Sequence, residues 1–374
     1  MKRPKPPVPI QLQPKPETMP ILPLLNRSPD SLLAEGWTAS QFSAATLLLA
    51  ARLRAHKVQA AALWFDDAAR FASALLAAWL AGAEVYLPPN LAEENRRWAE
   101  AGGAVWLSDV PEVSDGLWLY DGAAEQASAP AEALEWPREN VLYLKTSGSS
   151  GEAKVETKTR AQMLAEVAAV ADRLPESWRG LAAVGSVSPQ HLYGLTFRVF
   201  VSLAAGWTIG RRQCVYPELL LADSRRECVW IASPALLNRL GEGRNWARLR
   251  QNVRGIISAG GMLPEATAAL LQEKLGFAPH DVYGSTETGV IALRQGGDWE
   301  LLPAVEASVN AENIFQVASP WSGGGRQTAD AVRLDGRRLE LLGRQDRIIK
   351  LEDKRVSLAQ LEHDLLAHAW MADA

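Results

Sequence analysis

Short apolar segments alternate with helix-like segments along most of the chain, and this alternation constrains the fold more than any other feature of the sequence. The apolar segments have the length of buried strands and lie at residues 60–65, 84–87, 104–107, 117–120, 141–144, 228–231 and 253–257. Strands that alternate with helices are typical of an α/β fold with a largely parallel sheet. Because the pattern recurs in the second part of the chain, we predict a doubly wound α/β fold with two halves.

Several other segments carry simple structural signals. The stretch 1–24 contains closely spaced prolines and scattered lysines, so we expect a solvated, extended tail there. The apolar run Phe71 to Ala83 is shorter than the roughly 20 residues that a membrane-spanning helix needs, so we predict a buried helix and no membrane span. Residues 234–240 are predicted to be helical, and Pro264 is predicted to be the first residue of a further helix.

The last third of the chain contains a predicted hairpin. The segments 331–334 and 338–342 have strand-like composition, and Asp335 with Gly336 is predicted to form the turn between them. The glycine-rich stretch 319–328 precedes the hairpin, and we expect it to be a flexible connection.

Charge and cysteine content exclude several classes of protein. The chain has 39 basic and 43 acidic residues and a net charge of -4, so no basic face for nucleic acid is predicted. Cys214 and Cys228 have neither CxxC nor Cys/His spacing, so we expect no disulfide framework and no structural zinc site. A cytoplasmic location is therefore expected.

A segment rich in glycine and hydroxyl side chains follows the predicted strand 141–144. It starts Thr146-Ser147-Gly148-Ser149-Ser150-Gly151 and continues through two further residues to Lys154. Glycines let backbone amides close around an anion, hydroxyl groups donate hydrogen bonds, and Lys154 adds a positive charge. The segment therefore suits a polyphosphate.

Other interpretations of this segment remain open. A flexible Gly/Ser linker has a similar composition, although the preceding strand and the terminal lysine favour a phosphate loop. A nucleophilic serine is a further alternative, but the segment does not match GxSxG. The GxxxxGK[ST] spacing of a Walker A loop is absent, so kinase or ordinary ATPase chemistry is not predicted.

A second polar segment, 281–288, offers groups that suit a nucleotide. Tyr283 provides an aromatic face for a base, and Gly284 follows it. Thr286 provides a hydroxyl for an α-phosphate, and Glu287 provides a hard oxygen ligand for Mg²⁺. The alternative is a surface turn with a solvated glutamate.

Together these segments resemble the adenylate-forming (AMP-binding) superfamily, which comprises acyl-CoA and aryl-CoA synthetases, adenylation domains of peptide synthetases, and luciferases. The resemblance extends from about Leu75 to Glu362. It implies a large AMP-binding domain of the doubly wound type at 25–345 and a short remnant of the family's small C-terminal domain at 346–374. The family's small domain supplies a late catalytic lysine, and no residue of this sequence matches it.

The resemblance assigns several residues to the adenosine part of ATP. Asp281 would accept a hydrogen bond from the adenine amino group, and Tyr283 would stack on the ring. Gly260 and Gly261 would lie along one face of the adenine. Asp330 would accept hydrogen bonds from both ribose hydroxyls, in an element where Ala329 replaces the family's glycine.

The resemblance assigns other residues to the reacting groups. Thr286 would contact the α-phosphate, Glu287 would bind Mg²⁺, and Arg344 would reach the nucleotide. Lys154 would neutralise charge during the reaction. His191, in the segment 190–195, would border the acyl site, although a lone histidine is also often structural.

The implied function is ATP- and Mg²⁺-dependent activation of a small-molecule carboxylic acid to an acyl-adenylate, with release of pyrophosphate. Transfer to the thiol of CoA, or to the phosphopantetheine of an acyl carrier protein, would follow. The alternative is a noncatalytic relative that binds ATP or acyl-AMP and needs a partner for the missing C-terminal domain. A Rossmann-type dehydrogenase has little support because no GxGxxG follows an early strand.

Overall fold

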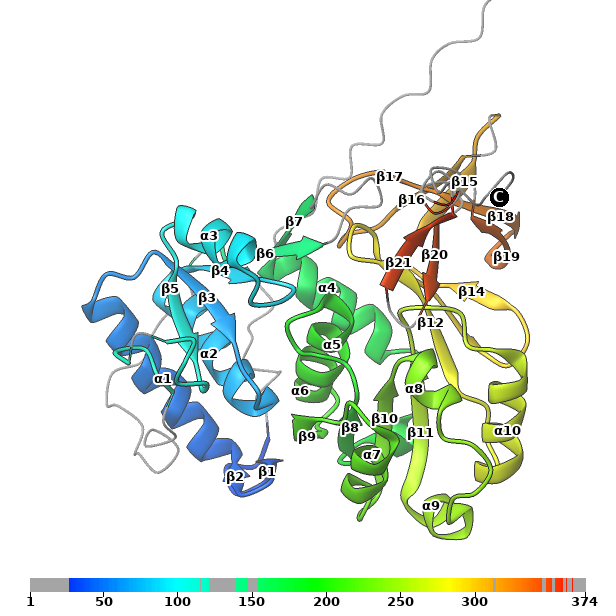
Figure 1. The fold of residues 1–374 in the computed structure, drawn as a ribbon, viewed down its shortest axis with the longest axis horizontal. Coiled ribbons are helices and arrows are strands. Elements are labelled where there is room, and N and C mark those ends of the chain that lie inside the picture. The colour runs from blue at the N-terminus through cyan, green and yellow to red at the C-terminus, as the bar shows by residue number, and fades with distance from the viewer. Residues whose placement is uncertain are drawn as a thin grey trace, which may run out of the picture.

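The computed structural model describes residues 27–114, 116–120, 137, 139–146, 154–311, 314–344, 348–351, 354–358, 361 and 365. Among these residues, two large sheets with surrounding helices form the two halves of the molecule, and α4 (Arg160–Ala171) lies between them (Figure 1). The predicted α/β fold with two halves is therefore confirmed. The expected tail at 1–24 lies outside the described residues.

The first half contains a five-stranded sheet. In chain order its region comprises β1 (Leu32–Ala34), β2 (Trp37–Thr38), α1 (Ala39–Ala55), β3 (Ala60–Trp64), α2 (Ala68–Ala81), β4 (Glu84–Leu87), α3 (Glu93–Ala101), β5 (Val105–Ser108), β6 (Val141–Thr146) and β7 (Lys154–Thr159). The sheet has the strand order β5–β3–β4–β6–β7, while β1 and β2 join the sheet of the second half. β3 to β6 are parallel, and β7 returns antiparallel to β6.

Local sequence signals set the ends of α2, the helix at the centre of this half. The Asp67 side chain accepts hydrogen bonds from the backbone amides of Ala69 and Arg70, at 2.8 and 3.1 Å, and so caps the first turn. Gly82 ends the helix with a φ of 84°, a left-handed conformation that glycine adopts without strain. Nearly all of α2 is buried, which confirms the predicted buried helix.

The second half begins with the parallel part of the larger sheet. Its elements after α4 are η3 (Glu176–Trp178), β8 (Ala182–Gly185), α5 (Leu192–Gly194), η4 (Leu195–Val201), α6 (Ser202–Ala204), β9 (Thr208–Gln213), α7 (Pro217–Asp223), β10 (Cys228–Ala232), α8 (Pro234–Asn238), α9 (Trp246–Asn252), β11 (Val253–Ser258), α10 (Glu265–Leu275) and β12 (His280–Ser285). Strands β9, β8, β10, β11 and β12 are neighbours in that order and run parallel.

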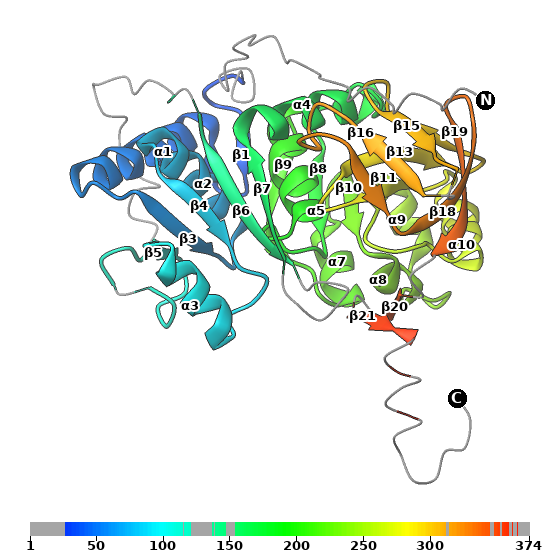
Figure 2. The same cartoon turned by 90° about the horizontal axis from the view of Figure 1, so that it is seen from above.

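An antiparallel region extends the larger sheet. It comprises β13 (Gly289–Gln295), β14 (Trp299–Leu301), β15 (Glu306–Val309), β16 (Phe315–Ala318), β17 (Arg326–Thr328), β18 (Asp330–Asp335) and β19 (Arg338–Arg344), followed by the hairpin of β20 (Ile348–Leu351) and β21 (Lys354–Ser357). The order β12–β13–β14–β19–β18 completes one edge of the described sheet, and β15–β16–β17 form a separate small sheet. Figure 2 shows β20 and β21 projecting from the main body.

The two halves share one hydrophobic core. Helix α2 packs against β9 and η4 of the second half, and the rings of Trp79 and Phe200 lie 5.7 Å apart across this contact. Figure 2 shows the long β6–β7 pair between the halves, beside β8 and β9. The shared core fixes the end of β6 relative to the ends of the parallel strands in the second half.

Three details of the prediction are wrong. Residues 117–120 form no strand, because Leu119 makes only an isolated bridge to Ser108. Pro264 is the residue before the helix, since α10 starts at Glu265. The hairpin turn consists of Gly336 and the residue after it, because Asp335 still pairs with Arg338 in the strands.

The expected flexible connection at 319–328 is anchored near its start. The Trp321 side chain is buried, and its indole donates a hydrogen bond to the Val290 carbonyl at 3.0 Å. Within the described part of the chain, every helix is too short or too polar to cross a bilayer.

Candidate functional site

A cavity of about 410 Å³ lies where the two halves meet. The residues that line it come from the ends of β4, β6, β8, β9, β10, β11 and β12 and from the start of α5: Pro89, Leu144, Lys145, Thr146, Ser186, Val187, Ser188, Gln190, His191, Leu192, Tyr193, Gln213, Ser233, Ala259, Gly260 and Thr286. Ligands of open α/β sheets bind at the carboxyl ends of the strands. The cavity is therefore at the expected edge of both sheets, and it brings Thr146, His191, Gly260 and Thr286 together.

The segment around His191 is held rigidly against the cavity. The buried Gln190 side chain donates a hydrogen bond to the Phe65 carbonyl at 2.9 Å, which ties the second half to the first. The Tyr193 hydroxyl donates to the Ile257 carbonyl at 2.7 Å, and burial raises the pKa of this phenol well above its usual value. His191 itself is exposed at the residue that precedes α5. It can therefore meet a ligand in the cavity.

Gly260 and Gly261 follow β11, and Gly260 lines the cavity. Gly260 has a φ of 93°, and a side chain there would meet nothing within 4 Å, so the backbone is open toward the space beside it. Gly261 is also exposed. Both glycines present a backbone surface that a flat ring can approach.

Asp281 lies on β12 as a buried carboxylate with one satisfied oxygen. Its Oδ2 accepts a hydrogen bond from Arg294 Nη2 at 2.8 Å, whereas no donor among the described residues meets hydrogen-bond geometry at Oδ1. Burial raises the pKa of Asp281, and Arg294 and the nearby Ser258 hydroxyl oppose that shift. A buried acceptor without a donor favours a ligand that brings one, and the amino group of adenine is such a donor.

Tyr283, Asp330 and Arg344 form a connected cluster. The Tyr283 hydroxyl donates to Asp330 Oδ2 at 2.7 Å, and Arg344 Nη1 lies 3.6 Å from the other carboxylate oxygen, Oδ1. Asp330 and Arg344 are opposite each other in the β18–β19 pair, so the hairpin fixes their contact. Gly284 continues the strand after Tyr283, and a Cβ there would come within 2.1 Å of the Gly289 carbonyl oxygen.

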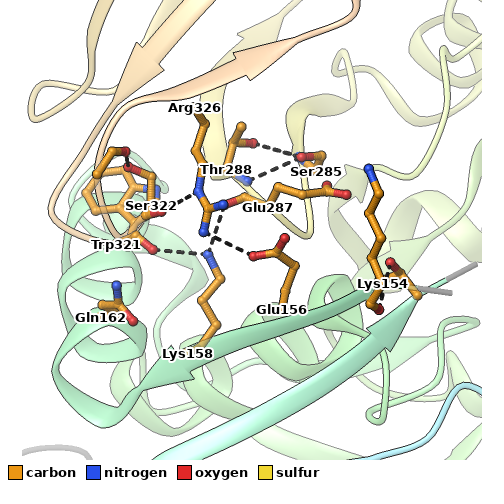
Figure 3. A network of polar contacts seen from close by, with 12 residues as sticks. Lys154, Glu156, Lys158, Gln162, Ser285, Glu287, Thr288, Trp321, Ser322 and Arg326 are labelled. Atoms are coloured by element: carbon orange, nitrogen blue, oxygen red, sulfur yellow. Dashed lines mark hydrogen bonds and ion pairs between the residues drawn. The ribbon is translucent and has the colours of Figure 1, made fainter. Parts of the chain in front are cut away.

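The turn after β12 presents Thr286 and Glu287. Its shape is fixed by the Ser285 amide, which donates to the Thr288 hydroxyl at 3.0 Å, and by the Thr288 amide, which donates to the Ser285 hydroxyl at 3.3 Å. Thr286 lines the cavity, and Glu287 is half-buried next to it. In Figure 3 the Glu287 side chain extends toward Lys154.

The β6–β7 pair brings Thr146 and Lys154 together. The two residues are opposite each other in the strands, and the Thr146 hydroxyl donates to the Lys154 carbonyl at 3.4 Å. The residues between them, Ser147, Gly148, Ser149, Ser150 and Gly151 included, lie outside the described part of the chain. Both ends of the predicted phosphate loop therefore meet at the cavity side of the sheet.

A comparison with protein families decides which family this arrangement represents. Residues 30–314 match the family described as AMP-binding enzyme. The chain is a member of this AMP-binding family. A search of curated protein sequences found no match.

Solved structures agree with the AMP-binding family. Unliganded o-succinylbenzoate CoA synthetase from Bacillus subtilis has a TM-score of 0.71 at 20% identity, covering 94% of this chain and 87% of the other. ATP-bound MatB from Rhodopseudomonas palustris has a TM-score of 0.71 at 18% identity, covering 94% and 83%. The amide bond synthetase McbA from Marinactinospora thermotolerans has a TM-score of 0.71 at 20% identity, covering 93% and 83%. At these identities the likeness supports the fold.

The described residues of this AMP-binding protein fit a magnesium ion that also binds the phosphates of a nucleotide. None of them forms a group of three or more His, Cys, Asp and Glu side chains that could hold a metal ion. Mg²⁺ commonly binds through one or two protein carboxylates plus substrate phosphates and water. Glu287 at the cavity edge fits that mode.

Sequence reasoning missed a group of charged residues that lies between β7 and the Glu287 turn. Glu156 and Lys158 lie on β7, and Arg326 joins them from the start of β17 (Figure 3). Their one sequence signal is the placement of charges at alternate positions after Lys154, which also fits a solvated strand face. Their contacts connect the phosphate-loop strand to the Glu287 turn.

Proposed function

We propose that this AMP-binding protein activates a small carboxylic acid with ATP and passes the acyl group to a thiol. The observation that carries the proposal is one cavity that joins Thr146, at the start of the phosphate loop, to Thr286 and His191. Lys154 closes the same loop, and Glu287 follows Thr286 directly. A cation and a carboxylate adjacent to the hydroxyls that line the cavity support a triphosphate site there.

The proposed first step forms an acyl-adenylate. A carboxylate oxygen of the acid attacks the α-phosphorus of ATP, a new P–O bond forms, and the bond between the α- and β-phosphates breaks, so that pyrophosphate leaves with the electron pair. Two anions must approach each other, so the site has to neutralise negative charge. Lys154 serves the leaving phosphates, and Thr286 donates a hydrogen bond to the α-phosphate. Magnesium held by Glu287 would supply further positive charge.

The remaining residues hold the nucleoside. Oδ1 of Asp281 is the acceptor for the adenine amino group, and Tyr283 supplies the aromatic face for the ring. Gly260 and Gly261 have no side chains that would block the other face of the adenine ring. Asp330, fixed by its contacts to Tyr283 and Arg344, accepts the ribose hydroxyls. This assignment gives the adenine amino group a partner on β12 and the ribose hydroxyls a partner on β18.

The acid enters the cavity beside His191 and Tyr193. Apolar walls at Pro89, Leu144 and Leu192 suit a small or medium acyl or aryl group, which would share the cavity of about 410 Å³ with the phosphates. The proposed second step is attack of a thiolate on the acyl carbonyl with AMP as the leaving group. The acceptor is coenzyme A or the phosphopantetheine of an acyl carrier protein. Likeness in fold to a CoA synthetase and to an amide bond synthetase supports activation of an acid as the first step.

Exchange of labelled pyrophosphate into ATP tests the proposal, because it requires reversible formation of the acyl-adenylate. Purified protein with Mg²⁺ and a panel of aryl, short-chain and medium-chain acids should show exchange that depends on at least one acid. Tight binding of ATP without exchange on any acid would instead support a noncatalytic nucleotide-binding subunit. Absence of ATP binding would reject both functions.

A further inference from the structure

A buried lysine, Lys158, connects two distant loops next to the proposed magnesium ligand. Its side chain is about 1% exposed. Its Nζ donates hydrogen bonds to the Trp321 carbonyl at 3.0 Å and to the Glu287 carbonyl at 3.4 Å. The second carbonyl belongs to the residue whose carboxylate is proposed to bind magnesium. Lys158 therefore contacts the metal-binding turn from the protein side.

Strand β7 carries both Lys154, which faces the proposed triphosphate site, and Lys158, which faces the protein interior. Lys154, Glu156 and Lys158 occupy alternate positions of β7, so their side chains lie on one face of the strand. Lys154 is exposed, Glu156 is half-buried and Lys158 is buried. Figure 3 shows this row facing the Glu287 turn. A shift of the turn relative to β7 would therefore alter both the Lys158 contact and the position of Glu287 opposite Lys154.

An ion pair also attaches to β7 the loop whose Trp321 carbonyl accepts from Lys158. Arg326 Nη2 lies 3.1 Å from Glu156 Oε2, and Arg326 Nε donates to the Ser322 carbonyl at 2.9 Å. Ser322 follows Trp321, whose carbonyl accepts from Lys158. The loop is therefore attached to β7 at two places, through Lys158 and through Glu156.

Glu166 fixes the other end of the turn. This buried carboxylate accepts a hydrogen bond from the Val290 amide at 2.7 Å, three residues after Glu287. Burial raises the pKa of Glu166 and lowers the pKa of Lys158, and the charge of each residue opposes the shift of the other. The Val290 amide at the start of β13 is thus held by the Glu166 carboxylate, and the Glu287 carbonyl is held by the Lys158 ammonium, which leaves the turn little freedom to move.

We propose that Lys158 is a positioning residue for magnesium in the proposed adenylation: it fixes the backbone of Glu287 so that the carboxylate meets a metal ion bound to the phosphates of ATP. The proposal rests on the proposed function. An ammonium group with two backbone carbonyls as partners is costly to bury, and an apolar side chain of similar shape would fill the same space. We infer that the charged side chain is useful because it fixes the position of the turn. Residues that hydrogen-bond to metal ligands orient those ligands in the same way.

Calorimetric titration with ATP at increasing Mg²⁺ tests this role without requiring turnover. Lys158→Met keeps the shape and removes the donors, and Lys158→Arg keeps charge and donors. Lys274→Met is the control, because it removes a half-buried lysine of α10 whose charge partner is Glu273. We expect Lys158→Met to raise the Mg²⁺ concentration for half-maximal ATP affinity by about 10- to 100-fold, as for residues that orient metal ligands. ATP affinity without Mg²⁺ should remain close to wild type, and Lys158→Arg should recover part of the loss.

Several results would overturn the proposal. A folded Lys158→Met protein with wild-type Mg²⁺ dependence would show that the lysine is only structural, even if the protein melts at a lower temperature. Wild-type ATP affinity that is the same with and without Mg²⁺ would also overturn it. If Lys158→Met does not fold, Arg326→Gln decides, because it releases the loop from Glu156: a raised Mg²⁺ requirement supports the proposal, and an unchanged one contradicts it. If wild-type protein binds ATP in a Mg²⁺-dependent manner but shows no pyrophosphate exchange with any acid, the proposed function is refuted. The role of Lys158 in Mg²⁺ binding would not be refuted by that result.

Discussion

The Tyr283 hydroxyl donates a hydrogen bond to Asp330 Oδ2 at 2.7 Å, although the two residues lie 47 positions apart in the chain. The contact joins the strand that would carry the adenine-stacking ring to the strand that would hold the ribose. Burial and the Asp330 charge raise the pKa of Tyr283, so the phenol stays protonated as a donor. The ring and the carboxylate are therefore fixed relative to each other before a nucleotide binds.

Removal of this hydroxyl should weaken nucleotide binding. Tyr283→Phe keeps the ring and deletes a hydrogen bond to a charged group, which typically contributes about 1.5–3 kcal/mol. We expect the dissociation constant of ATP, measured by calorimetry, to rise by roughly tenfold or more. Tyr216→Phe, at a tyrosine that is 63% exposed, is the control. Equal affinities in wild type and Tyr283→Phe would show that this contact does not organise the nucleotide site.

Loss of the cation at the end of the phosphate loop should slow the chemical step. Lys154→Ala removes a positioned charge from the proposed triphosphate site, and such groups typically contribute on the order of a hundredfold to a thousandfold in rate. Pyrophosphate exchange should fall by about that factor, while Lys274→Ala should retain the wild-type rate. An unchanged exchange rate in Lys154→Ala would remove this lysine from the mechanism.

Gly194 should be essential for the shape of the cavity wall. A Cβ at this position would lie 1.9 Å from the Ser188 carbonyl oxygen, which belongs to a residue that lines the cavity. Gly194→Ala should destabilise the protein by about 1–3 kcal/mol, as overpacking usually does, and it should weaken acid-dependent exchange. Gly243→Ala is the matched control, because a Cβ there meets nothing within 4 Å. Equal melting temperatures for the two variants would contradict the packing at Ser188.

His280 should make the folded protein sensitive to acid. Burial against Trp178, 4.8 Å away between ring centroids, lowers the pKa of His280 from 6.5 to about 4. The unfolded chain therefore binds the proton first, and stability present above pH 6.5 is lost as the pH falls toward 4. The loss amounts to up to about 3 kcal/mol. His280→Phe should lose less free energy of unfolding than wild type between these pH values in urea titrations. If wild type and His280→Phe lose the same free energy of unfolding as the pH falls, His280 is not the source of the acid sensitivity.

Much of the fold could be predicted because local patterns determine it. Alternating strands and helices indicated the two wound halves, and the hydroxyl-rich segment was correctly expected to follow a strand. Pairing of Asp330 with Arg344 was not predicted, since it depends on the register of a hairpin. Residues 117–120 have strand composition, but within the described part of the chain they pair through one isolated bridge.

The contacts of Lys158 could not be predicted from the sequence. They join residues 129 and 163 positions apart, and only the tertiary fold brings those segments together. A charged residue on a strand usually indicates a solvated face, so the pattern itself favoured the wrong environment. Asp281 was recognised as a polar residue of the nucleotide segment, but its partner Arg294 depends on the pairing of β12 with β13.

The central claim is that Lys154 and Glu287 act on one magnesium-bound triphosphate. A double-mutant cycle measures this directly: Lys154→Ala, Glu287→Gln and the double variant are titrated with ATP in saturating Mg²⁺. Residues that share one ligand should show a coupling energy of about 0.5–3 kcal/mol, with the double variant departing from the sum of the single losses. Losses that add within about 0.3–0.5 kcal/mol would show that the two residues act independently, and would contradict the account.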